Sequence, residues 1–376
     1  MSPWRPQGGS AGRPLSRRLT FRPLLLPLEE RAVPSTVTAT DPVPAVTPSP
    51  APKPAAKQVY AVGADVGNPP LVQVYNADGS LKFSFMAYDA NFRGGVRVAV
   101  GDVTGDGVPD IVTAPGAGMP PQVKVFDGTS GAEIANYMAY RETFKGGVYV
   151  AVADINGDGH ADIITGAGQG GGPHVKVMDG AHVVPSINGT TTPPPASTLP
   201  GAGDAPGVLT EFYAYNPLFH GGVRVAAGDV NGDGVPDIIT AAGPGGGPHV
   251  KAIDGKTGNL LYEFYAFDST YTGGVYVTAG DIVGDGKSEL VVGSGTGLKE
   301  VKVYDRSGNA VRTYTINDPA AALGVHVGMA DVNGDGKADL LLSVGTSVQA
   351  RDPLTDATIQ TITPFDPTVL GGVFVG

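Results

Sequence analysis

The chain has 376 residues, of which 57 are glycine and none is cysteine, and its formal net charge is −11. Without cysteine it has no disulfide to hold the fold and no thiolate for catalysis. The negative charge argues against nucleic acid as a partner, because phosphates bind Lys and Arg. No apolar run approaches the roughly 18 residues of a membrane span.

Residues 1–57 differ in composition from the rest of the chain. They are basic at first and then rich in Pro, Ala, Thr and Val without strand or helix periodicity, which predicts a disordered tail that serves as a spacer. Within it, residues 28–35 (LEERAVPS) resemble a short N-terminal segment of predicted surface or exported proteins of planctomycete-type bacteria. That resemblance implies export.

Residues 58–376 contain a pattern that recurs five times. The motif Asp-x-[Asn/Thr]-x-Asp-Gly-x-x-Asp, or a close variant, begins at Asp102, Asp154, Asp229, Asp281 and Asp331. The spacing is 50 to 52 residues, except for one interval of 75 that contains a low-complexity insertion at 182–206. Periods of this length are typical of solenoids and propellers.

A single repeat, residues 95–140, predicts four short strands, over 96–100, 110–114, 123–125 and 134–140. Four antiparallel strands without a helix are typical of a propeller blade. Inner strands that begin with Gly-Val occur six times, and the last, at 372–376, would complete a blade whose other strands lie in 58–88. We therefore predict an all-β fold, a six-bladed β-propeller closed by its N- and C-terminal strands. A seven-bladed ring, or one part of a longer ring, is the alternative.

The nine-residue motif has the ligand chemistry of calcium. It offers side-chain oxygens at positions 1, 3, 5 and 9, a backbone carbonyl at position 7 and a glycine at position 6 for a sharp turn. This hard-oxygen set suits Ca²⁺ better than Mg²⁺. Position 12 is Thr, Val or Leu instead of the bidentate Glu of an EF-hand, and a strand follows it. Alternatively, these Asp, Asn and Gly residues only form turns.

The stretch from 144 to 168 carries a family resemblance, through Phe-Lys-Gly-Gly at 144–147, Asp-Ile-Asn-Gly-Asp-Gly-His-Ala-Asp at 154–162 and Gly-Ala-Gly at 166–168. These motifs resemble the FG-GAP (VCBS-type) repeat family, whose best-known members form the calcium-binding propeller head of integrin α chains. The resemblance implies about four structural Ca²⁺ sites. A fifth loop is degenerate, because Val283 replaces the position-3 ligand and Glu289 replaces the position-9 Asp.

The metal ligands implied by this resemblance lie at positions 1, 3, 5, 7 (through the carbonyl) and 9 of each loop. They are Asp102, Thr104, Asp106, Val108 and Asp110; Asp154, Asn156, Asp158, His160 and Asp162; Asp229, Asn231, Asp233, Val235 and Asp237; Asp281, Asp285, Lys287 and Glu289; and Asp331, Asn333, Asp335, Lys337 and Asp339.

The loops also account for much of the acidity of the chain. Three carboxylates in each of five loops make up 15 of the 36 acidic residues, and four bound calcium ions would change the net charge from −11 to about −3. Such loops suit millimolar calcium outside cells, where modules bind it with dissociation constants of about 10⁻⁴–10⁻³ M. We therefore expect an extracellular or cell-surface location.

Two other groups of residues are candidate sites. His174 and His249 occupy equivalent Gly-Gly-Gly-Pro-His-Val-Lys motifs, where they either bind a transition metal, act as bases, or are structural residues of a turn. The residue after Gly-Val on the inner strands is aromatic or basic, which predicts a ring near one mouth of the channel. The ring either binds a sugar or peptide or fills space between blades. It consists of Arg97, Tyr149, Arg224, Tyr276, His326 and Phe374.

Together these features favour a monomeric binding or adhesion module for a glycan or a cell-surface protein, with calcium in a structural role. We expect no enzymatic activity, because nearly all the Asp residues that can be placed belong to the loops and no Ser-His-Asp set or Glu pair stands out. One alternative is a calcium-dependent carbohydrate-active enzyme, and another is a structural component of the cell surface. Since one fold hosts many functions, the choice depends on the sites.

Overall fold

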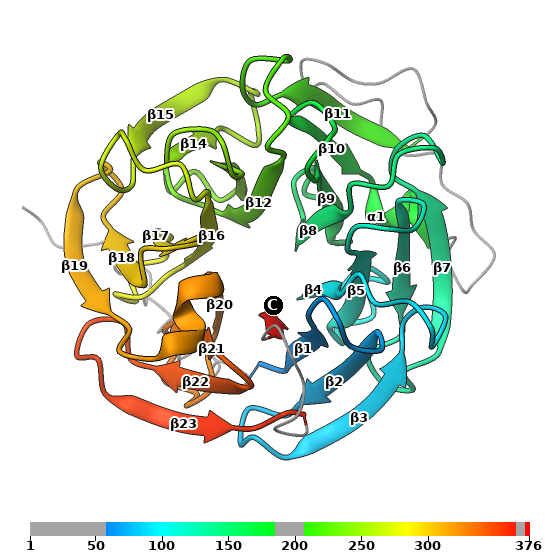
Figure 1. Cartoon of the computed structure of the whole chain (residues 1–376). Helices are drawn as coiled ribbons and strands as arrows, with labels where there is room; N and C mark the ends of the chain where they lie inside the picture. The colour runs from blue at the N-terminus through cyan, green and yellow to red at the C-terminus, as the bar shows by residue number, and fades with distance from the viewer. Residues whose placement is uncertain (1–57, 185–206, 366–372) are drawn as a thin grey trace, which may run out of the picture. The chain divides into compact units, whose positions relative to one another are not determined.

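The computed structural model describes residues 58–184, 207–365 and 373–376. In these residues, strands β1 to β24 form six four-stranded antiparallel sheets around a central axis (Figure 1). The predicted six-bladed β-propeller is thereby confirmed. The predicted tail, 1–57, and residues 185–206 of the predicted insertion lie outside the described residues.

The blades are numbered here in chain order, and within each the strands follow from the axis outward. Blade 1 contains β24 (Val373–Val375), β1 (Tyr60–Ala64), β2 (Leu71–Tyr75) and β3 (Leu81–Met86). Blade 2 contains β4 (Val96–Gly101), β5 (Asp110–Pro115), β6 (Gln122–Phe126) and β7 (Glu133–Met138). Blade 3 contains β8 (Val148–Ala153), β9 (Asp162–Ala167), β10 (His174–Met178) and β11 (Val208–Tyr213).

The second half of the ring repeats this order. Blade 4 contains β12 (Val223–Gly228), β13 (Asp237–Ala242), β14 (His249–Ile253) and β15 (Leu260–Tyr265). Blade 5 contains β16 (Val275–Gly280), β17 (Glu289–Ser294), β18 (Glu300–Tyr304) and β19 (Ala310–Thr315). Blade 6 contains β20 (His326–Ala330), β21 (Asp339–Val344), β22 (Ser347–Arg351) and β23 (Thr358–Ile362).

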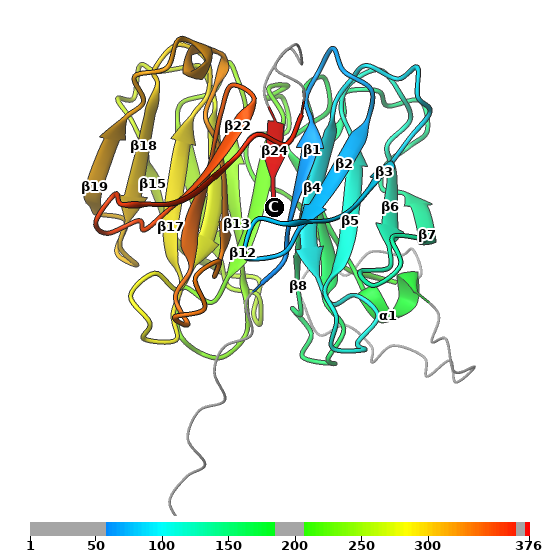
Figure 2. The same ribbon diagram turned by 90° about the horizontal axis from the view of Figure 1, so that it is seen from below.

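The two ends of the folded segment close the ring in blade 1. Strand β24 pairs antiparallel with β1, with Val375 opposite Val62 and Val373 opposite Ala64, and Figure 2 shows the two strands side by side. This pairing gives blade 1 its fourth strand and confirms the predicted closure. Strand β24 thereby covers the edge that β1 would otherwise expose, and the ring leaves only the short, protected inner edges that are typical of propellers.

Regular structure departs from the prediction in two details. The outer strand of blade 2 ends at Met138 and not at Tyr140, whose hydroxyl donates a hydrogen bond to the carbonyl of His174 in blade 3 (2.9 Å). The described residues also contain two short helices, α1 (Gly180–Val183) and a 3₁₀ helix (Pro319–Leu323). No helix in the described part of the chain is long and apolar enough to cross a membrane.

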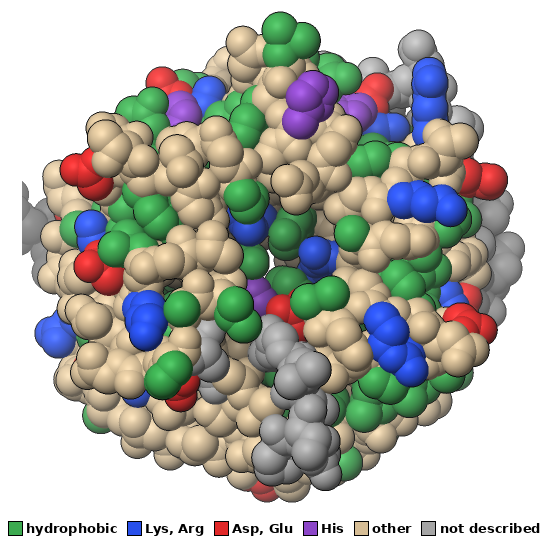
Figure 3. All heavy atoms as spheres, in the orientation of Figure 1, with side chains coloured by type: hydrophobic (Ala, Val, Ile, Leu, Met, Phe, Trp, Pro, Cys, Tyr) green, Lys and Arg blue, Asp and Glu red, His purple; other side chains and the backbone are tan. Residues whose placement is uncertain are grey.

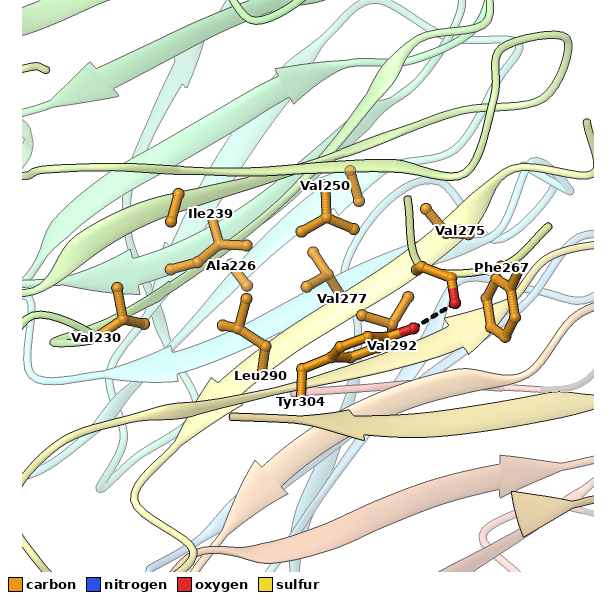
Figure 4. Close-up of a cluster of buried hydrophobic side chains, with 13 residues drawn as sticks. Ala226, Val230, Ile239, Val250, Phe267, Val275, Val277, Leu290, Val292 and Tyr304 are labelled. Atoms are coloured by element: carbon orange, nitrogen blue, oxygen red, sulfur yellow. Dashed lines mark hydrogen bonds between the residues drawn. The ribbon is translucent and has the colours of Figure 1, made fainter. Parts of the chain in front are cut away.

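Apolar side chains fill the spaces between neighbouring blades. Between blades 4 and 5, for example, Ile239 and Val250 pack near Leu290 and Val292, all fully buried (Figure 4). Branched side chains on a pleated surface pack well in this position, which explains the many Val and Ile residues of the inner strands. Where the backbones come closest only glycine fits.

Gly63 on β1 shows why. A Cβ atom on this residue would lie 2.4 Å from the carbonyl oxygen of Val96 in the next blade. The second strand of blade 1 and the first strand of blade 2 therefore approach one another more closely than a side chain at Gly63 would allow.

Candidate functional site

The five Asp-rich motifs all lie in the same structural position. Each connects the first and second strands of its blade, as the loop of blade 4 (229–237) connects β12 to β13. Blade 1 has no such loop because its first two strands, β24 and β1, come from opposite ends of the folded segment. The prediction that the motif is a loop between two strands is confirmed.

The position-1 aspartate sets the conformation of each loop. In blade 4, the Asp229 carboxylate accepts hydrogen bonds from the backbone N–H groups of Gly232 (2.6 Å), Asp233 (3.2 Å) and Gly234 (2.9 Å). Gly234, at position 6, has φ = 87°, a left-handed conformation that glycine adopts without strain. The position-1 residues of the other loops accept equivalent bonds, namely Asp102, Asp154, Asp281 and Asp331.

The position-9 acid is buried beneath the loop. Asp237 is only 1% exposed, and its carboxylate accepts hydrogen bonds from the N–H groups of Val230 (2.9 Å) and Gly255 (3.1 Å). Burial raises the pKa of Asp237 to about 6 and that of the equivalent Asp162 to about 8, and the amide donors only partly offset it. Burial likewise raises the pKa of Asp339 to about 6 and also raises that of Asp110. A nearby positive charge would therefore stabilise the ionised form of the carboxylate at this position.

Positions 3 and 5 lie on the exposed side of the loop. In blade 4, the Asp233 carboxylate accepts a hydrogen bond from Val235 N–H (3.0 Å), and the side-chain amide oxygen of Asn231 accepts one from Asp233 N–H (2.8 Å). Asn156 and Asn333 accept the same bond from the N–H groups of Asp158 (2.9 Å) and Asp335 (2.8 Å), and their amide nitrogens also donate to the carboxylates of these residues. The Thr104 hydroxyl lies 3.4 Å from the Asp102 carboxylate.

Position-7 side chains reach the preceding loop of the ring. A ring nitrogen of His160 lies 3.0 Å from the carbonyl oxygen of Val103, and the Lys287 ammonium donates a hydrogen bond to that of Asn231 (3.5 Å). The remaining position-7 residues are Val108, Val235 and Lys337. Only the carbonyl oxygen of this position is therefore a candidate ligand.

Backbone hydrogen bonds also connect neighbouring loops. The N–H groups of Ala161, Ser288 and Ala338, all at position 8, donate to the position-1 carbonyl of the preceding loop at 2.7 to 2.8 Å. Pro236 has no N–H, so this bond is missing between the loops of blades 3 and 4.

The donor atoms of four loops fit a calcium ion in chemistry and charge. The loops of blades 2, 3, 4 and 6 each hold three carboxylates and one amide or hydroxyl oxygen. In the described residues, no Lys or Arg forms an ion pair with these carboxylates. The carboxylates are turned toward the loop amides, and no three His, Asp or Glu side chains of the described chain are grouped as a metal site. Calcium binding stays a prediction.

Blade 5 balances its loop charge with a side chain. The Arg306 guanidinium lies 2.9 Å from a carboxylate oxygen of Asp285 and 3.7 Å from one of Glu289. Glu289 is 5% exposed, and burial raises its pKa while Arg306 acts to lower it. At position 3, Val283 supplies no oxygen and is exposed.

Arg306 was missed by the sequence analysis, although a signal exists. It follows Asp305 at the end of the third strand, where three other blades have an Asp-Gly pair. The glycines at this place are Gly128, Gly180 and Gly255, each of which donates its N–H to the position-9 carboxylate. The Gly-to-Arg change occurs in the one repeat that also lacks the usual residues at positions 3 and 9.

The six residues of the predicted channel ring are brought together by the structure. They line a cavity of about 210 Å³ on the propeller axis, between the inner strands of all six blades. The Arg97 guanidinium lies 4.6 Å from the Tyr149 ring centre, that of Arg224 lies 4.1 Å from the Tyr276 ring centre, and His326 stacks on Phe374 at 4.0 Å. Except for Phe374 in blade 1, each ring residue lies five positions before the Asp-rich loop of its blade, roughly 17 Å along the strand.

The two equivalent histidine motifs belong to separate blades. His174 on β10 lies 3.3 Å from the Glu211 carboxylate, and His249 on β14 lies 3.1 Å from that of Glu263. Each ring also lies against a tyrosine of its own blade, Tyr213 or Tyr265. These contacts fit the structural interpretation of both residues.

Comparison with known proteins gives matches to two repeat families. An FG-GAP repeat model matches residues 142–181, which contain the loop of blade 3, and an FG-GAP-like repeat model matches residues 281–342, which contain the loops of blades 5 and 6.

Several solved structures are similar to this chain. The Dos1 propeller is 10% identical, with 79% of this chain and 66% of that chain covered and a TM-score of 0.42. The exotype rhamnogalacturonan lyase YesX is 14% identical, with 83% and 63% covered and a TM-score of 0.41. The V. cholerae biofilm matrix protein Bap1 is 21% identical, with 68% and 34% covered and a TM-score of 0.34. This chain thus spans about two thirds or less of the length of these proteins.

The fold and the loops define a class, the six-bladed β-propellers built from repeats with an Asp-rich loop on the inner hairpin. Within that class, the two matching models show that the chain contains FG-GAP-type repeats at residues 142–181 and 281–342.

Proposed function

We propose that the chain is an extracellular binding module for a glycan or a cell-surface protein, and that four calcium ions stabilise its propeller. One observation carries the calcium part. The loop that lacks the position-3 oxygen ligand is the one whose carboxylates, Asp285 and Glu289, pair with a guanidinium. A fixed cation replaces the metal where the ligand set is incomplete, which is expected if the other loops hold a cation of their own.

The ligands would be the oxygens of positions 1, 3, 5 and 9 with the position-7 carbonyl, in the loops that begin at Asp102, Asp154, Asp229 and Asp331. Calcium there would neutralise the clustered carboxylates and hold each inner hairpin closed. The channel ring lies roughly 17 Å along the strands from the loops. The ions would therefore stabilise the fold and would not contact a ligand bound at the channel ring.

The channel ring supports the binding part of the proposal. Aromatic faces with a few polar groups are the usual lining of ligand sites, and this lining lies in a cavity of about 210 Å³. Both matching family models describe repeats and not an enzyme. An enzyme that acts on carbohydrates is the second candidate function, and it would need an acid and a base beside the bound sugar.

A polysaccharide and glycan array tests the proposal, run in millimolar calcium and again in chelator, with the supernatants analysed for cleaved products. We expect retention in calcium, weaker retention in chelator as the propeller loosens, and no product. Released product would favour the enzyme. A blank glycan array with retention on surface proteins would assign the module to a protein partner, and equal retention in both conditions would contradict a role for calcium.

A further inference from the structure

Two arginines line the axial cavity, and among the described residues neither forms an ion pair with a carboxylate. In Figure 3, Lys or Arg side chains border the hollow at the centre of the ring, and the arginines that line the cavity are Arg97 and Arg224. Arg224 is only 6% exposed, and its Nη1 donates a hydrogen bond to the carbonyl of Ala242 (3.3 Å). In the described part of the chain, Arg224 Nε has no acceptor, and neither have Nε and Nη1 of Arg97.

Aromatic rings cover the faces of both guanidinium groups, and the hydroxyls of Tyr149 and Tyr276 are acceptors for part of their edges. The N–H groups of Arg224 Nε and of Arg97 Nε and Nη1 are left without one. The Tyr149 ring centre lies 4.6 Å from the Arg97 guanidinium and 5.3 Å from that of Arg224. Arg97 also lies 5.1 Å from the Phe374 ring centre. Cation–π contacts of this kind hold a guanidinium in place. They supply no acceptor for its in-plane N–H groups, which are the ones that bind carboxylates.

The cavity has a net positive charge. Burial acts to raise the pKa of Tyr149, yet Arg224 and Arg97 together lower it below its ordinary value, as expected beside two cations. Burial lowers the pKa of His326, so its ring is neutral, and Nδ1 donates to the carbonyl of Val373 (2.7 Å). The negative charge of Asp65 acts to raise the pKa of both His326 and Tyr276. This one carboxylate offsets one of the two positive charges of the arginines.

Buried guanidinium groups with unsatisfied N–H donors are costly to maintain without a ligand. We propose that the axial cavity binds the carboxylate of an acidic sugar, with the in-plane N–H groups of Arg97 and Arg224 as donors and an aromatic ring as the surface for the sugar. The proposal rests on the proposed binding function and names its ligand class. A volume of about 210 Å³, comparable to about seven water molecules, admits one sugar unit and not a folded partner.

The planar, bidentate edge of guanidinium favours a carboxylate, and two such groups with aromatic neighbours distinguish an acidic sugar from a neutral one. The ligand would enter where the inner strands begin, because Arg97 and Arg224 are each the second residue of their strand, β4 and β12. That end lies away from the Asp-rich loops, whose negative charge would repel an anion.

The test measures binding of glucuronate, glucose and acetate to the calcium-loaded chain by titration calorimetry and by ligand-observed NMR. We expect glucuronate to bind and glucose to bind at least about tenfold more weakly, since each charge-assisted hydrogen bond contributes about that factor. Arg224→Gln and Arg97→Gln should each weaken glucuronate binding by about tenfold or more. Arg312→Gln, on the exposed strand β19, is the matched control and should leave the affinity unchanged.

Arg97→Gln keeps the test valid if the more buried Arg224→Gln variant fails to fold. No binding of glucuronate by the unaltered chain would overturn the proposal, and so would Gln variants that both bind glucuronate as tightly as the unaltered chain. If glucose bound as tightly as glucuronate, the arginines would not be recognising a carboxylate, and the proposal would be wrong. If acetate bound as tightly as glucuronate, the sugar ring would contribute nothing, and a sugar ligand would be ruled out. Retention on the glycan array without glucuronate binding would reject this site and leave the proposed function intact. Glucuronate binding with a blank array would support the site and contradict glycan retention.

Discussion

The loops of blades 4 and 5 have the same backbone but balance their negative charge differently. Asp229 and Asp281 each accept three backbone N–H bonds, at 2.6 to 3.2 Å and 2.7 to 3.1 Å. In both loops, position 6 is a glycine with positive φ (87° and 83°). The position-1 Asp and the glycines are therefore sufficient for the turn, whether or not the rest of the ligand set is present.

The difference lies in three other positions. Blade 4 has Asn231, Asp237 and Gly255, whereas blade 5 has Val283, Glu289 and Arg306. The longer Glu and the Arg form an ion pair under the loop that blade 4 lacks. The comparison teaches that turn formation and charge compensation are encoded separately. We predict that blade 4 obtains its cation from solution and blade 5 from its own chain.

Removal of calcium should have the largest effect on the unaltered protein. A ligand at a hundred times its dissociation constant stabilises the fold by about 2.7 kcal/mol per site, and four sites are predicted. Thermal unfolding in 10 mM calcium and in chelator measures the difference. We expect a marked fall in Tm in chelator, and magnesium at the same concentration should restore less of it. An unchanged Tm would show that the loops act only as turns.

Asp233→Asn in blade 4 should separate metal binding from turn formation. Asparagine still accepts the bond from Val235 N–H but removes one ligand charge, so we expect a loss of about 2 kcal/mol in calcium and almost none in chelator. Asp229 is unsuitable, because its three backbone bonds contribute with or without metal.

The matched control for this change is Asp285→Asn in blade 5. It weakens a half-exposed ion pair with Arg306, and we expect a loss of about 0.5 kcal/mol that is equal in calcium and in chelator. Thermal or urea unfolding of both variants provides the comparison. Equal calcium dependence of the two variants would contradict the difference between the blades.

Arg306→Ala should destabilise the protein by about 1–2 kcal/mol in both conditions. The substitution leaves the buried Glu289 carboxylate without its cation. Removing one partner of a fully buried ion pair costs several kcal/mol, and the cost is lower here because Arg306 is in contact with water. Urea unfolding at neutral pH measures the loss, and Arg306→Lys should recover part of it. A variant as stable as the original chain would show that Arg306 does not balance the loop.

Lys287→Ala should have the smallest effect. The ammonium group donates one long hydrogen bond, 3.5 Å, to the carbonyl of Asn231 in the neighbouring loop, so we expect at most about 0.5 kcal/mol. The backbone bond from Ser288 to Asp229 still connects the two loops. A larger loss in urea unfolding would indicate that the side chain, and not the backbone, couples the blades.

Much of this organisation could be predicted from the sequence because it repeats. The alternation of residues in 96–100 predicts the strands of a blade. The six Gly-Val segments predict that β24 pairs with β1, because each of them marks the first strand of a blade. The positions of the loops and of the channel ring followed from the same period. Tyr140 was placed in a strand because the pattern carries no information about its bond to His174 in the next blade.

Arg306 could not be assigned to the loop for a similar reason. It lies 17 residues after Glu289 and reaches the loop only when the second and third strands of blade 5 pair. Likewise, the spacing of Arg97 and Arg224 does not indicate that each has an N–H group without an acceptor among the described residues, because that depends on every side chain packed around the axis.

The number of calcium ions bound tests the central claim most directly. Titration calorimetry on the unaltered chain should give four sites. The combined variant Val283→Asn, Glu289→Asp and Arg306→Gly, which gives the blade 5 loop the residues of blade 4, should give five. Zero sites, or five sites before any change, would contradict the separation of turn formation from metal binding.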